Sequence, residues 1–160
     1  GSRDQCCGTK GFPIFQTLEK KGYAVWRVSH IGGHRFAPTA IDFPTGHYWA
    51  WLNDEAIDAI VHHHGHPEML KQYYRGHSNI GAKEQIIERE LFLRKGWEAW
   101  KDERIISQEA DELTFQVQTD LKSYRVQLEA LPPIVARAKC STEETKPYAQ
   151  YRVIKFDEHT

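Results

Sequence analysis

The sequence lacks the features that mark several classes of protein. No apolar run approaches the roughly 18 residues that a membrane span needs, and no apolar stretch follows the first four residues as it would in a secretory signal. An excess of one charge is also missing, because 21 Lys and Arg against 22 Asp and Glu leave a net charge of −1. That balance excludes the strongly basic surface of a nucleic-acid binder. We therefore expect a cytoplasmic protein whose partners include neither nucleic acid nor a membrane.

Cysteine is scarce, and known catalytic motifs are missing. The three cysteines, of which Cys6 and Cys7 are adjacent, cannot make a disulfide framework. Thiols of this kind persist in a reducing compartment as metal ligands or nucleophiles. Because adjacent side chains point apart, we expect one of the pair to be a ligand and the other a bystander. The sequence contains no glycine-rich nucleotide loop, no P-loop, no Gly-x-Ser-x-Gly and no His-Glu-x-x-His.

What is present indicates one compact α+β protein. A length of 160 residues with 40 % hydrophobic side chains suits a single domain, or a domain with an appendage. Apolar residues at helical spacing predict helices over 7–21, through 56–61 after an N-cap at Asn53 or Asp54, over 68–74, and from 83 to about 100. Alternating or β-branched runs predict strands over 23–28, 40–43, 47–51, 113–117, 124–128 and 151–154. Residues 44–46 are expected to close a hairpin. Helical spacing gives way to period-two alternation after about residue 100. We therefore predict a core over 1–101 and an antiparallel β extension over 102–160.

Histidine is abundant, and two of the nine are placed where they can converge. His30 and His34 flank Gly32 and Gly33 at the end of a predicted strand. Glycine permits backbone conformations and a close approach that a side chain would block. Two imidazoles need further ligands to hold a metal, and the cysteines are the natural source. The alternative is that both are ordinary loop histidines.

Other polar clusters have simpler interpretations. His62, His63, His64 and His66 follow a predicted helix, and we interpret them as capping or adventitious histidines because no thiolate is nearby. A run of mixed charge on the last predicted helix indicates a solvated face; it comprises Glu84, Glu88 and Glu90 with Lys83, Arg89 and Arg94. Six aromatic residues are expected to pack the core and the β appendage: Trp49, Trp51, Tyr73, Tyr74, Trp97 and Trp100.

Two segments together resemble a known family. Residues 3–8, Arg-Asp-Gln-Cys-Cys-Gly, followed by residues 29–37, Ser-His-Ile-Gly-Gly-His-Arg-Phe-Ala, resemble the sucrase/ferredoxin-like family, which includes the thioredoxin-like ferredoxin domain of Apd-type proteins. Residues 43–49 resemble the family's Pro-x-Gly-x-Tyr/Trp hairpin, and residues 74–76 its Tyr-Arg-Gly segment. Cys140, followed by Pro147 and Tyr148, resembles the tail of bacterial members.

The resemblance implies a thioredoxin-like ferredoxin core that holds a [2Fe-2S] cluster through two cysteines and two histidines. The family's ligands correspond to Cys7, His30 and His34 in this sequence. Its first cysteine, with the strand that carries it, would lie before Gly1, so the resemblance implies a chain truncated at its N-terminus that need not hold the cluster. Arg3, Asp4 and Arg35 would set the local charge.

The function implied is electron transfer or redox sensing with a redox partner protein that the sequence does not identify, rather than catalysis. Neutral imidazole ligands raise the potential of an iron–sulfur cluster relative to thiolates. Two alternatives from other classes remain open. One is a zinc-binding structural domain that uses Cys6 or Cys7 with His30 and His34, and the other is a thioredoxin-like thiol protein with a cysteine nucleophile.

Overall fold

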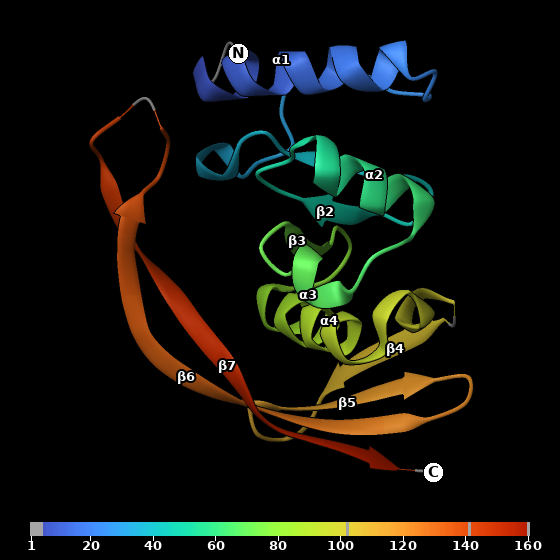
Figure 1. Ribbon diagram of the computed structural model, residues 1–160. Coiled ribbons are helices and arrows are strands. Elements are labelled where there is room, and N and C mark those ends of the chain that lie inside the picture. Colours follow the sequence, from blue (N-terminus) through green and yellow to red (C-terminus); the bar gives the residue numbers. More distant parts are fainter. Residues whose placement is uncertain (1–4, 102, 141, 160) are drawn as a thin grey trace.

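The computed structural model describes residues 5–101, 103–140 and 142–159 and shows a mixed α+β fold with antiparallel sheets (Figure 1). The predicted α+β class is therefore confirmed, while its thioredoxin-like type stays a prediction. The helices are α1 (Gln5–Lys20), η1 (His34–Phe36), α2 (Asp54–His62), α3 (Pro67–Leu70), α4 (Ala82–Lys95) and η2 (Gly96–Trp100). The strands are β1 (Ala40–Ile41), β2 (His47–Trp49), β3 (Tyr74–His77), β4 (Arg104–Gln108), β5 (Thr114–Thr119), β6 (Ser123–Arg137) and β7 (Thr145–His159).

The segment after α1 differs from the prediction. Residues 23–28 form no strand, although they are β-branched and aromatic. β-propensity reflects packing against neighbouring strands, and no strand pairs with this segment. Trp26 and Val28 are accordingly 76 % and 66 % exposed. The guanidinium of Arg27 instead lies 4.9 Å from the ring centre of Phe12 on α1.

The first sheet has the order β1-β2-β3 and is antiparallel throughout. The hairpin predicted over 40–51 is confirmed, with shorter strands. The helix predicted over 68–74 was wrong at its end, because α3 stops at Leu70 and Tyr74 begins β3. Tyr74 pairs with Trp49 across the sheet, and its side chain is 1 % exposed. Long-range strand pairing thus overrides the local helical pattern here.

The second sheet is an antiparallel meander in the order β4-β5-β6-β7. Its three predicted strands are confirmed and extended, whereas β4 was not predicted. The strands β6 and β7 run on beyond the sheet as a long hairpin, which reaches from the sheet at one end of the molecule to α1 at the other (Figure 1). Their register is irregular between Leu131 and Ile134, where Pro132 and Pro133 cannot donate to the ladder.

Helix α4 lies between two hydrophobic clusters. Phe92 belongs to the cluster of the first sheet, with Trp49, Leu70 and Tyr74. Ile87 and Leu91, one turn apart on another face of α4, belong to the cluster of the second sheet. The same helix therefore supplies both cores. The division at residue 101/102 predicted from composition stays a prediction. Among the described residues, no helix combines the length and the apolar character needed to cross a bilayer.

We expect Asn53→Ala to weaken α2. The side chain of Asn53 accepts a hydrogen bond from the amide of Ala56 at 2.8 Å and donates one to the Tyr73 hydroxyl at 3.0 Å. Loss of an N-cap costs about 1 kcal/mol of unfolding free energy. Urea denaturation measures this change, with Asn79→Ala on an exposed turn as the control. An equal loss in both variants would contradict the capping role.

We expect protonation of the Glu158 carboxylate to contribute to unfolding at low pH. Its carboxylate, at the end of β7, accepts hydrogen bonds from Lys122 and Lys95, which lower its pKa from 4.5 to about 2. Because the folded pKa is depressed, this stabilisation is present above pH 4.5 and is lost as the pH falls toward 2. A carboxyl NMR titration measures the midpoint. Lys122→Gln should raise it, and Lys146→Gln, elsewhere on the hairpin, should not.

Candidate functional site

The structure brings the three predicted ligand residues together from α1 and the loop before η1. The Sγ of Cys7 on α1 lies 3.1 Å from Nδ1 of His34, the first residue of η1. The ring of His30 stacks on that of His34, with centroids 4.5 Å apart and planes 24° from parallel. His30 is exposed, whereas Cys7 and His34 are half-buried. One sulfur and two imidazoles thus share one edge of the molecule.

Two glycines allow this convergence. Gly32 and Gly33 have φ angles of +86° and +68°, in the region that favours glycine, and they turn the chain between His30 and His34. A Cβ on Gly33 would also lie 3.4 Å from Cδ2 of Phe36, which is a tight contact. The hydroxyl of Tyr48 donates to the carbonyl of Ile31 at 3.0 Å and fixes the loop to β2.

Cys6 forms a disulfide with Cys140, which corrects the expectation that the cysteines would remain thiols. The two residues are 134 positions apart in the sequence, with Cα atoms 6.3 Å apart, and the bond joins α1 to the β6–β7 hairpin. Adjacent residues of a helix point in different directions, so Cys6 faces the hairpin while Cys7 faces His34. As long as the disulfide persists, Cys6 offers no thiolate to a metal. Arg3 and Asp4 lie outside the described residues.

The arrangement of Cys7, His30 and His34 can be compared with what a bound metal requires. Within the described ranges, no group of three or more His, Cys, Asp or Glu residues is arranged to hold a metal ion. An imidazole binds metal through the lone pair in its ring plane, and a stacked pair does not by itself aim both lone pairs at one point. The donors suit iron or zinc in kind, since they are one thiol and two imidazoles. Their number, however, falls short of the four ligands that a [2Fe-2S] cluster uses.

The four clustered histidines have local structural roles. His63 ends α2 in the left-handed conformation and stacks on Trp97, with ring centroids 4.8 Å apart. His66 caps α3, where its ring accepts from the amide of Glu68. His62 and His64 approach the carboxylate of Asp58 at 3.7 and 2.8 Å. The hydrogen bond from His64 lowers the pKa of Asp58. The interpretation as a cap at the end of the preceding helix is confirmed for His63, whereas His66 caps the start of α3 instead.

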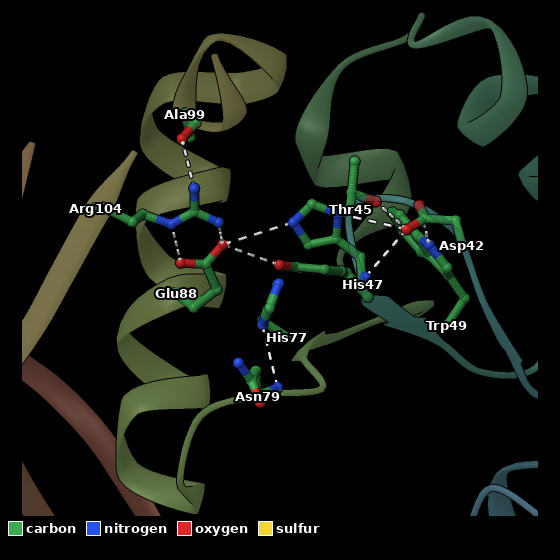
Figure 2. Close-up of polar contacts among 10 residues, drawn as sticks. Asp42, Thr45, His47, Trp49, His77, Asn79, Glu88, Ala99 and Arg104 are labelled. Atoms are coloured by element: carbon green, nitrogen blue, oxygen red, sulfur yellow. Dashed lines mark hydrogen bonds and ion pairs between the residues drawn. The ribbon is translucent and has the colours of Figure 1, made fainter. Parts of the chain in front are cut away.

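A buried polar network was missed by the sequence analysis. Glu88, predicted on a solvated face, is 1 % exposed. Figure 2 shows its carboxylate between Arg104 and His47. It accepts from Nε of Arg104 at 2.6 Å and from the Tyr74 hydroxyl at 3.2 Å, and it lies 3.9 Å from His47. The sequence did contain one sign that Glu88 is buried: it lies one turn before Phe92, on the buried face of α4.

Asp42 and Tyr74 have shifted pKa values in this network. Burial alone would raise the pKa of Asp42, but hydrogen bonding by His47, Thr45 and Trp49 outweighs it and lowers that pKa. Burial, together with the charge of Glu88, raises the pKa of Tyr74 well above its ordinary value. The network connects β2, β3, α4 and β4, and its central groups are shielded from solvent. It therefore connects these four elements within the interior.

The fold and the clustered thiol and imidazoles define an α+β protein with a Cys/His site at the junction of α1 and a glycine loop. Comparison with protein families then matches residues 1–76 to the sucrase/ferredoxin-like family. The resemblance predicted from the sequence is thus confirmed over this part of the chain, which carries Cys7, His30 and His34. Searches of curated proteins and of solved structures gave no significant match.

We expect Glu88→Gln to destabilise the protein strongly. Removing one charge of a buried pair leaves Arg104 without its anion and costs about 3 kcal/mol of unfolding free energy. Glu90→Gln on the same helix removes only the exposed pair with Arg94, so its cost should stay within about 0.5 kcal/mol. Urea denaturation of both variants measures the difference. Equal values would show that the buried pair does not hold the sheets together.

Proposed function

We propose that this protein is a [2Fe-2S] cluster-binding electron-transfer or redox module, with Cys7, His30 and His34 as ligands. The observation that carries the proposal is the approach of Cys7 Sγ to within 3.1 Å of His34 Nδ1, with His30 stacked alongside. The family match over residues 1–76 covers all three residues and supports the same assignment. The role is that of an electron carrier to a partner protein, rather than a catalyst.

The environment of the three donors suits this role. A bound cluster would supply one-electron chemistry, and neutral imidazole ligands favour a higher potential than an all-thiolate set. His30 is exposed, so this imidazole would lie on the solvent side of the site. The half-buried Cys7 and His34 would lie on the protein side of the site.

The proposal requires a fourth ligand and a rearrangement of the imidazoles. Cys6 is excluded while it is bonded to Cys140, so the fourth donor must come from outside the described cluster. The family resemblance places a cysteine before the position of Gly1. The loop can accommodate a change of ring orientation, because the glycines between His30 and His34 carry no side chains to obstruct it.

A second function is favoured by the same close contact. A thiol 3.1 Å from an imidazole can pass its proton to the ring, which is how cysteine nucleophiles are activated. The Cys6–Cys140 disulfide places a sulfur pair beside this thiol in the sequence, and a thiolate can attack a disulfide by exchange. This arrangement would define a thiol protein without a cluster. A zinc-binding structural site is the other alternative, since zinc accepts the same donors.

The visible absorption spectrum, with counts of iron and acid-labile sulfide, distinguishes these functions. The measurement is made on this chain and on a version extended upstream of Gly1, both purified anaerobically. We expect the extended protein to be coloured and to hold two irons, because it can supply the missing ligand. A colourless extended protein with zinc would support the structural site instead. A colourless protein without metal would leave the thiol function.

Variants of the extended protein assign the ligands. His34→Ala and Cys7→Ser should each abolish or strongly shift the visible bands, since each removes a metal–ligand bond. His64→Ala removes an exposed histidine that contacts Asp58, and should leave the spectrum unchanged. Bands that survive His34→Ala would contradict the ligand assignment, even if the protein contains iron.

A further inference from the structure

A pocket of about 290 Å³ lies behind the glycine loop, on the side of the first sheet. Its wall is formed by the loop itself, by β2 and by residues around β3. The lining residues that matter here are Gly32, Thr39, Tyr48, Arg75, Ser78 and Gln85. This volume is near the lower end of the range for small-molecule sites. The loop that carries His30 and His34 is therefore also one wall of a cavity.

The charge beside this pocket is positive and uncompensated. Within residues 5–101, 103–140 and 142–159, neither Arg35 nor Arg75 has a carboxylate within 4 Å. Arg75 is exposed at the edge of the pocket, yet partial desolvation, with the nearby positive charges of Arg35 and Arg89, lowers the pKa of its guanidinium. Like charges gathered without counterions raise the free energy of the site, and a bound anion would relieve this repulsion.

Aromatic rings hold the two guanidinium groups and leave their N–H donors available. The guanidinium carbon of Arg75 lies 3.9 Å from the ring centre of Phe36, and that of Arg35 lies 4.5 Å from the same ring. Arg35 also lies 3.6 Å from the ring centre of Tyr148 on β7. One terminal nitrogen of Arg35 is buried and has no hydrogen-bond partner in the described chain. Such stacking orients an arginine without using its donors.

We propose that this pocket binds a small molecule through a phosphate group, with Arg75 as the principal donor. Ser78 and Thr39 line the same cavity, and their hydroxyls can donate to the remaining oxygens. Phe36 and Tyr48 also line the cavity and supply an aromatic wall for the rest of the ligand. Free phosphate and an organic phosphate share the recognised group, and the aromatic wall favours the organic form.

NMR titration of the ¹⁵N-labelled chain at constant ionic strength tests the proposal. The probes are inorganic phosphate and phenyl phosphate, with chloride as the ionic-strength reference. We expect saturable shifts of the amides of Gly32, Gly33 and Ser78 and of the Arg75 side-chain N–H, with tighter binding of phenyl phosphate. Equal affinities for the two probes would indicate that the pocket binds inorganic phosphate and does not use the aromatic wall. Shifts without saturation for both probes would overturn the proposal.

Variants locate the binding. Arg75→Gln should weaken phosphate binding roughly ten-fold or more, as expected for the loss of a charge-assisted hydrogen bond. Arg152→Gln makes the same change of charge on β7, where the arginine pairs with Glu129, and should leave the affinity unchanged. Equal weakening in both variants would contradict a defined pocket and indicate a general effect of charge.

Two checks make the variant data decisive. The same spectra report whether each variant is folded, and Arg75→Lys, which keeps the charge, should recover part of the affinity. Because the signals come from the pocket's own amides, the result does not depend on a cluster at Cys7, His30 and His34. Failure of the anion site would therefore leave the proposed redox function untouched.

Discussion

The buried pairing of Glu88 with Arg104 is the contact on which the junction of the two sheets depends. A carboxylate at 1 % exposure is costly unless it is paired and hydrogen-bonded, and here Arg104 and Tyr74 satisfy it. Arg104 begins β4, Tyr74 begins β3, and Glu88 lies on the helix between them. The apolar faces of α4 bury surface against both sheets, but the polar contact fixes their relative position because it is directional.

The candidate site depends instead on how α1 is held, at the opposite end of the molecule. Helix α1 contacts η1, and the hairpin of β6 and β7 is bonded to α1 through Cys6 and Cys140 (Figure 1). The turn at Gly32 and Gly33 then returns His34 to the sulfur of Cys7. A redox group here would lie at the surface, with one imidazole in contact with water. Such exposure suits exchange of electrons with another protein.

The sequence pattern predicted correctly those elements that are determined by residues close together in the chain. The cap at Asn53, the hairpin before Trp49 and the alternating strands of the second sheet all have short-range signals, and the structure contains them. The errors concern residues whose state depends on distant partners. The segment 23–28 has no strand to pair with. Tyr74 lies in a strand because it pairs with Trp49. Glu88 is buried because Arg104 supplies the opposite charge. For the site, spacing and resemblance selected Cys7, His30 and His34, but the bond from Cys6 to Cys140 joins residues too far apart for any spacing rule.

That bond has a consequence for the covalent architecture of the molecule. With Cys6 and Cys140 joined, residues 6–140 form a closed ring, and β7 lies outside it. A single backbone cut anywhere in residues 7–139 would open the ring without separating its parts, since both pieces would remain attached through sulfur. Only a cut combined with reduction of the disulfide would release them. The exposed segment around Trp26 could therefore be nicked while the two sheets remain on one covalent framework.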